Sequence, residues 1–218
     1  VDVNAGRLGV QGVHDHVRLG ETALLKALEI SPDHLGANDL LIRLYASTRQ
    51  LPQALQKCEE RLAANPKDEG ALRLLGIIAN LLGDHQKSVE AYERLLEVVK
   101  TPDVPLLNNL ATLYVDHFNK LDAAFDMARQ ARSLQPSVAG ALTPEAKSDA
   151  AFVADTLGWV LYRRGDFPQA FALAQEAVTQ IPDHPEIQSH FGLAAAAMGQ
   201  TEVARKALAA AVAGPDDF

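Results

Sequence analysis

Apolar and polar positions alternate along this chain in the manner of short amphipathic helices separated by turns. In Leu157–Ala170, LGWVLYRRGDFPQA, a small residue lies within an apolar helical run. A Gly-Asp pair then interrupts the run, and a second small residue opens the next one. The same pattern recurs at intervals of about 34 residues, which is typical of an array of helix-turn-helix repeats.

The period divides the chain into six repeats. They are assigned to residues 1–34, 35–68, 69–102, 104–137, 151–184 and 185–218, with Asp103 and the insert 138–150 outside them. We therefore expect residues 1–218 to form a single array.

Small residues recur at fixed positions of the repeat. The twentieth position holds Gly20, Ala54, Ser88, Ala124, Ala170 and Ala204, where repeat 104–137 is counted with a one-residue insertion near Asn119, and the eighth holds Gly76, Ala111, Gly158 and Gly192. Small side chains at these two positions allow antiparallel helices to approach closely. The twenty-seventh position holds Ala27, Ala131, Ala177 and Ala211, with Arg61 and Leu95 as departures. Between the helices, Gly83, Gly165 and Gly199 suit the left-handed conformation that ends a helix, and Pro32, Pro66, Pro136 and Pro182 close the repeats.

This arrangement of small residues and prolines resembles the tetratricopeptide-repeat family, over nearly the whole chain. The resemblance implies an all-α fold, an α-α superhelix (solenoid) of about six helix pairs with a right-handed twist. One pair cannot bury its apolar face alone, so such arrays are stabilised by contacts between neighbouring repeats.

Three segments depart from the repeat. Gly6, Gly9 and Gly12 predict an irregular first helix, with order beginning near His14. Thr143 before Pro144 is a helix start, so the first helix of repeat 151–184 should run from there to Arg164. Residues 137–142 should form a loop. The last helix, TEVARKALAAAVAG, is apolar nearly all round. This predicts that it is covered by a further helix, by a C-terminal segment or by a partner chain, which would be a second copy of this chain if the protein self-associates.

The composition argues against several classes of function. The formal charge of −8 argues against nucleic acid and anionic membrane surfaces, and no apolar run is long enough to span a membrane. Cys58 is the one cysteine, which excludes an intramolecular disulfide and leaves the cellular compartment open. No phosphate loop, nucleophile elbow, paired-carboxylate site or metal-ligand spacing occurs, and His14, His16, His34 and His184 are interpreted as surface residues. We therefore predict no enzymatic activity, no cofactor and no metal.

The family resemblance implies a concave groove lined by the first helix of each repeat. Carried over position by position, the groove residues are Arg43, Arg73, Asn80, Asn108, Asn109, Asp116, Asp155, Trp159, Tyr162 and Arg163, together with Asp39, Ser47, Ile77, Thr112, Phe152, Ser189, His190 and Leu193. Such a set suits an extended peptide or a helix, and the alternative is a solvated face without a ligand. Trp159 is either an interface residue or a packing residue. Arg43 and Arg73 could recognise a carboxylate, but the lysines of the family's carboxylate clamp are absent, so we do not expect a receptor for Hsp70 or Hsp90 tails.

We therefore predict a non-catalytic scaffold that binds a protein or peptide partner. The final two repeats are similar to those of bacterial tetratricopeptide lipoproteins linked to exopolysaccharide export and to the PEP-CTERM/exosortase sorting system. That resemblance implies a periplasmic or envelope location. The alternative is a regulatory or substrate-presenting module of a larger enzyme, such as a glycosyltransferase.

Overall fold

The computed structural model describes residues 3–135 and 143–213, and within them it contains helices and no strand. The helices are α1 (Val3–Ile30), α2 (Leu35–Ser47), α3 (Leu51–Ala64), α4 (Glu69–Leu81), α5 (His85–Val98), α6 (Val104–Asp116), α7 (Leu121–Leu134), α8 (Pro144–Arg164), α9 (Phe167–Gln180), α10 (Pro185–Ala197) and α11 (Thr201–Ala213). They form two compact parts, Val1–Lys100 with α1–α5 and Thr101–Phe218 with α6–α11. The all-α prediction is confirmed. The segment 137–142, expected to be a loop, lies outside the described residues.

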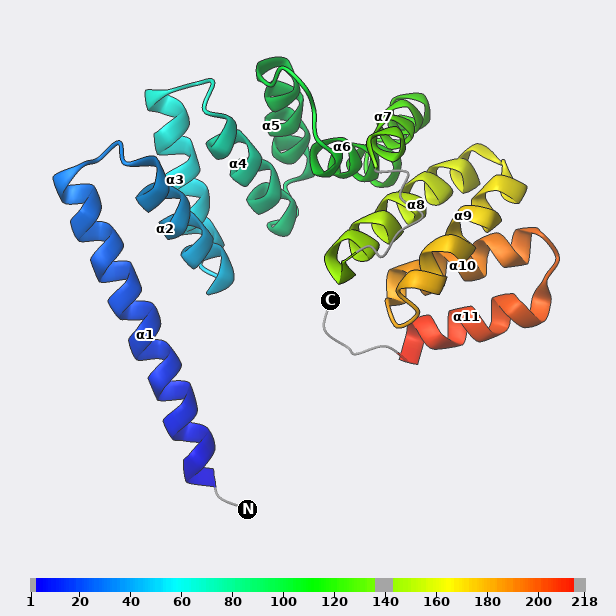
Figure 1. The fold of residues 1–218 in the computed structure, drawn as a ribbon, viewed down its shortest axis with the longest axis horizontal. Coiled ribbons are helices and arrows are strands. Elements are labelled where there is room, and N and C mark those ends of the chain that lie inside the picture. The colour runs from blue at the N-terminus through cyan, green and yellow to red at the C-terminus, as the bar shows by residue number, and fades with distance from the viewer. Residues whose placement is uncertain (1–2, 136–142, 214–218) are drawn as a thin grey trace. The chain divides into compact units, whose positions relative to one another are not determined.

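Within each part, consecutive helices pack as hairpins (Figure 1). In the Val1–Lys100 part α4 packs on α5, and in the Thr101–Phe218 part α6 packs on α7, α8 on α9 and α10 on α11. In the latter part the first helices of successive hairpins also touch, because α8 contacts both α6 and α10. We call the surface that these three helices form the α6–α8–α10 face.

The small positions lie where the paired helices cross. Ser88 Oγ donates a buried hydrogen bond of 2.7 Å to the carbonyl oxygen of Gly76. A Cβ atom added to Gly76 would lie 2.5 Å from the ring of Tyr92, and one added to Gly192 would lie 2.7 Å from Leu208 Cγ. The expectation that small residues permit close helix packing is confirmed at these crossings.

Polar side chains begin the helices and left-handed residues end them. Asp68, Asp84, Asp103 and Asp166 each accept a hydrogen bond from a backbone N–H of the first turn, as the N-cap of α4, α5, α6 and α9. His34 and His184 do the same for α2 and α10, through Nδ1. The interpretation of these two histidines as surface residues is therefore incomplete, because each caps a helix. At the end of α8, Gly165 has φ 87° and its N–H bonds the carbonyl oxygens of Leu161 and Tyr162.

Helix α8 follows its prediction. It begins after the N-cap Thr143, whose hydroxyl accepts from the Ala146 N–H at 3.3 Å, and it ends at Arg164. Its length is 21 residues, against 13 for both α6 and α10. Its additional residues lie at its start, whereas Asp155, Trp159, Tyr162 and Arg163 of the predicted groove lie toward its end.

Helix α1 differs from the irregular segment expected at the start of the chain. It is one continuous helix of 28 residues. Isolated glycines lower helix stability by about 1 kcal/mol each but do not end a helix, and neither a proline nor a Gly-Asp pair interrupts this stretch. Helix α1 packs against α2, but a Cβ added at Gly20 would meet nothing within 4 Å.

Candidate functional site

The groove residues predicted from the sequence fall in both parts of the molecule. In the Val1–Lys100 part, Arg43 on α2 and Asn80 on α4 are exposed and Arg73 on α4 is half-buried. In the Thr101–Phe218 part, Asn108, Asn109 and Asp116 lie on α6, and Asp155, Trp159, Tyr162 and Arg163 lie on α8. The residues of this second set, together with His190 on α10, make most of the side-chain contacts on the α6–α8–α10 face.

Trp159 is the centre of these contacts. Its indole Nε1 donates a hydrogen bond of 2.8 Å to Asp116 Oδ1 on α6. Its ring stacks on His190 of α10, with centroids 4.3 Å apart and planes within 8°. Tyr162 stacks nearly parallel to it at 5.2 Å, one helical turn further along α8. Trp159 thus joins all three helices while remaining partly exposed.

Arg163 attaches the same cluster to the end of α6. Its guanidinium donates to the carbonyl oxygen of Val115 at 3.2 Å and to Asn119 Oδ1 at 3.4 Å. The guanidinium carbon lies 5.6 Å from the centre of the Trp159 ring, within the range of a cation–π contact. The indole of Trp159 thus packs between helices, as the packing interpretation expects, and its partial exposure leaves the interface interpretation a prediction.

His190 and Asp155 form a buried pair beneath the indole. His190 Nδ1 lies 2.9 Å from Asp155 Oδ2, and the two side chains are 14% and 8% exposed. Burial alone lowers the pKa of His190, but its hydrogen bond to Asp155 and the charges of Asp155, Glu186 and Asp116 outweigh it, so the pKa of His190 lies above its ordinary value. The cationic form is therefore favoured against the indole ring.

Two acceptor atoms on this face have no hydrogen-bond donor. They are Asn108 Oδ1 on α6 and Asp155 Oδ1 on α8, and both are buried. A buried acceptor without a donor costs roughly 1–3 kcal/mol, so such atoms are uncommon in folded proteins. The face therefore has acceptor capacity that the residues described do not satisfy.

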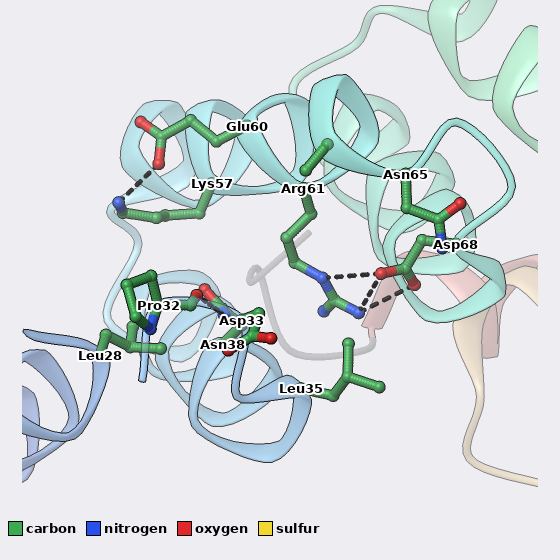
Figure 2. A pocket seen from close by; sticks show the side chains of 11 residues that line it. Leu28, Pro32, Asp33, Leu35, Asn38, Lys57, Glu60, Arg61, Asn65 and Asp68 are labelled. Carbon is green, nitrogen blue, oxygen red and sulfur yellow. Dashed lines mark hydrogen bonds and ion pairs between the residues drawn. The ribbon is translucent and has the colours of Figure 1, made fainter. Parts of the chain in front are cut away.

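A second polar cluster lies in the Val1–Lys100 part, around Arg61 of α3. Its guanidinium bonds both carboxylate oxygens of Asp68 at 2.8 Å and also bonds Asp39. The Arg61 side chain is only 9% exposed. Figure 2 shows Arg61 and Asp68 bonded to each other in the lining of a pocket of about 700 Å³. Sequence reasoning missed this cluster, although the arginine at a position that other repeats fill with alanine was its signal.

The pocket beside Arg61 has a mixed lining. Apolar side chains come from the end of α1 and from the turn before α2, and polar ones come from α3 and the α3–α4 turn (Figure 2). Lys57 is paired with Glu60 at 2.6 Å, and Asn38 donates to the carbonyl oxygen of Pro32 at 3.0 Å. The polar groups of the lining thus bond one another.

Cys58 is fully buried, as the free cysteine of a packed helix. Burial raises the pKa of its thiol to about 12, although the nearby Arg61 acts in the opposite direction. The interpretation of Cys58 as a small apolar residue agrees with this position. Among the helices of residues 3–135 and 143–213, none combines the length and hydrophobicity that crossing a lipid bilayer requires.

Comparison with known proteins places these observations in a family context. A family model described as tetratricopeptide repeat matches residues 40–105. A TPR repeat-containing protein of Pseudomonas aeruginosa is 27% identical over 164 residues, which cover 71% of this chain and 25% of that protein. The chain therefore spans about a quarter of the length of this relative.

Two solved structures show the same fold. YrrB, described as a TPR protein with an unusual peptide-binding site, is 19% identical with a TM-score of 0.63, and the match covers 87% of this chain and 91% of YrrB. PilW, described as a widely conserved type IV pilus biogenesis factor, is 18% identical with a TM-score of 0.66, covering 81% of this chain and 77% of PilW. At these identities the likeness concerns the fold alone.

Proposed function

We propose that this chain, which belongs to the tetratricopeptide-repeat family, is a scaffold that binds a protein or peptide partner on the α6–α8–α10 face. The coarse part of this statement, an interaction module built of helical repeats, follows from the family. The location of the binding surface and the absence of catalysis are our inference.

One observation supports the location: the cluster of Trp159, Tyr162, Arg163 and His190 at the centre of the face. Aromatic residues and arginine contribute most of the energy at protein interfaces. Here the hydrogen bond to Asp116, the ring stack on His190 and the bonds from Arg163 already fix their positions. Side chains that are held before binding lose less conformational entropy when a partner arrives.

The cellular role that we propose is in the bacterial envelope, in exopolysaccharide export or the sorting of proteins. It is supported by the resemblance of the last two repeats to envelope lipoproteins, and the solved structure of similar fold that is described as a type IV pilus biogenesis factor is compatible with it. The alternative is a module of a larger enzyme such as a glycosyltransferase. The chain spans about a quarter of the length of the Pseudomonas aeruginosa relative. Identifying any domain joined to it in the natural polypeptide therefore distinguishes the envelope role from the role in a larger enzyme.

Photocrosslinking tests the binding face. A photoreactive phenylalanine analogue replaces Phe152, an exposed residue of α8, or in a matched control Gln130, an exposed residue of α7. We expect a crosslinked species in an extract of the source cells from position 152 and none from position 130. Trp159→Ala in the first variant should remove it. Equal crosslinking from both positions, or crosslinking that survives Trp159→Ala in a folded protein, would contradict the proposal.

A further inference from the structure

We propose that the partner of the α6–α8–α10 face presents a basic segment, whose lysine or arginine side chains donate hydrogen bonds to the carboxylates of this face. The inference rests on the proposed function, since it specifies the chemistry of the partner for the same surface.

The donors at the centre of the face are directed inward. Trp159 Nε1 donates to Asp116, and Arg163 donates to the carbonyl oxygen of Val115 and to Asn119 Oδ1. His190 Nδ1 faces Asp155. A partner that supplies further acceptors would thus compete with bonds already made within the protein.

Acceptors, by contrast, are in excess. Asp116 on α6 and Glu186 on α10 are exposed carboxylates that a partner's side chains can reach. In addition, Asn108 Oδ1 and Asp155 Oδ1 are buried and have no donor among the described side chains. Exposed carboxylates on two helices of one face favour a ligand that brings N–H groups.

The charges of the face agree with its hydrogen-bonding groups. The negative charges are Asp116, Asp155 and Glu186, all close enough to His190 to raise its pKa. The positive charges of the three helices are Lys147, Arg163 and Arg164 and, in its cationic form, His190, while Glu145 and Asp149 of α8 add to the negative ones. Negative charge prevails even when His190 is protonated, and it increases when His190 loses its proton. Complementarity of charge therefore favours a basic partner, while an acidic peptide tail would meet like charges.

Fluorescence anisotropy with two labelled peptides tests this inference on the intact chain. One probe is a fluorescein-labelled peptide of alternating lysine and alanine, and the other has glutamate in place of lysine. We expect the lysine peptide to bind, the glutamate peptide not to bind, and a peptide with arginine in place of lysine to bind at least as well. Binding of the glutamate peptide in preference to the lysine peptide would overturn the proposal.

A matched pair of variants separates a specific site from general attraction to an acidic protein. Asp116→Asn removes one negative charge from the face, and Asp126→Asn removes one from α7, where the side chain is 65% exposed. We expect Asp116→Asn to weaken binding of the lysine peptide about fivefold and Asp126→Asn to leave it unchanged, with both variants folded by circular dichroism. Equal weakening by both would refute a localised site.

Asn108→Leu provides a second variant. If the buried oxygen contributes to partner binding, this change weakens binding of the lysine peptide, while the melting temperature of the protein stays constant or rises. A fall in melting temperature with unchanged affinity would assign Asn108 a structural role only. If neither peptide binds although position 152 crosslinks a partner, the inference of a basic partner fails and the proposed function stands.

Discussion

Replacing Gly158 tests whether the small positions of the repeat set the distance between paired helices. A Cβ atom added to Gly158 would lie 3.2 Å from Leu173 Cβ, 3.3 Å from the Ala170 carbonyl oxygen and 3.4 Å from the Ala174 nitrogen. Two of these neighbours are backbone atoms of α9, which cannot rotate away as a side chain does. The larger the new side chain, the further α8 and α9 must separate.

The magnitude follows from two opposing effects. Replacing a helical glycine gains about 0.8–1 kcal/mol of helix propensity, and overpacking a close contact costs about 1–3 kcal/mol. For Gly158→Ala the contact is tight by only a few tenths of an ångström, so we expect a change in the free energy of unfolding of about 1 kcal/mol or less. For Gly158→Leu the steric effect dominates, and we expect destabilisation of about 1–3 kcal/mol.

Urea unfolding followed by far-ultraviolet circular dichroism measures these differences, with Gly20→Ala as the control. Nothing lies within 4 Å of a Cβ at Gly20, so the propensity gain should appear there without a steric cost and raise stability by about 0.5–1 kcal/mol. An unchanged unfolding curve for Gly158→Leu would refute the close packing of α8 on α9. A destabilised Gly20→Ala would show that a helix packs closely against α1 at Gly20.

The remaining predictions concern the cluster of the face, the cysteine and the last helix. Because the pKa of His190 is raised on folding, its contribution to stability is complete below its ordinary value of about 6.5 and is lost as pH rises through the raised value. His190→Gln should therefore reduce the loss of stability, measured by urea unfolding, that the wild-type protein shows as pH rises above about 6.5. Trp159→Ala should destabilise the fold by about 2 kcal/mol in the same assay, less than the 3–5 kcal/mol of a fully buried tryptophan, and a larger loss would make it a core residue. Iodoacetamide should label Cys58 only after unfolding, and labelling of the native protein would contradict its burial. The Val212 side chain of α11 is 84% exposed. If the protein self-associates through α11, light scattering should show a concentration-dependent dimer that Val212→Glu abolishes. A wild-type protein that is monomeric at every concentration would refute this.

The sequence predicted those features that depend on local chemistry and on the repeat. The start of α8 at Thr143-Pro144 and the left-handed Gly165 follow from capping preferences, which act within one turn. The close approach of α8 and α9 at Gly158 follows from the period, because a small residue recurs where the two helices of a repeat cross. Helix α1 was mispredicted because Gly6, Gly9 and Gly12 were expected to disrupt a helix that such glycines only weaken, and because the repeat led us to expect a helix pair in residues 1–34.

The side-chain pairs of the face could not be predicted in the same way. His190 meets Asp155 across 35 residues and Trp159 meets Asp116 across 43. The period places these residues on one face, but which of them touch depends on how far each helix is rotated and shifted against its neighbour. These are properties of the packed hairpins, and no single-sequence pattern encodes them directly.

The two polar clusters differ in whether their carboxylates are paired with a charge, and this difference explains why we assign binding to one and not the other. The guanidinium of Arg61 is nearly buried and bound by two carboxylates, Asp39 and Asp68, which connects α3 to α2 and to the N-cap of α4. A buried charge needs such partners, so that cluster is sufficiently explained by stability. The Trp159 cluster, by contrast, lies beside the exposed carboxylates of Asp116 and Glu186. Arg61 pairs the carboxylates of its own cluster, whereas Asp116 accepts from the uncharged indole of Trp159 and keeps a negative charge that a basic partner can pair.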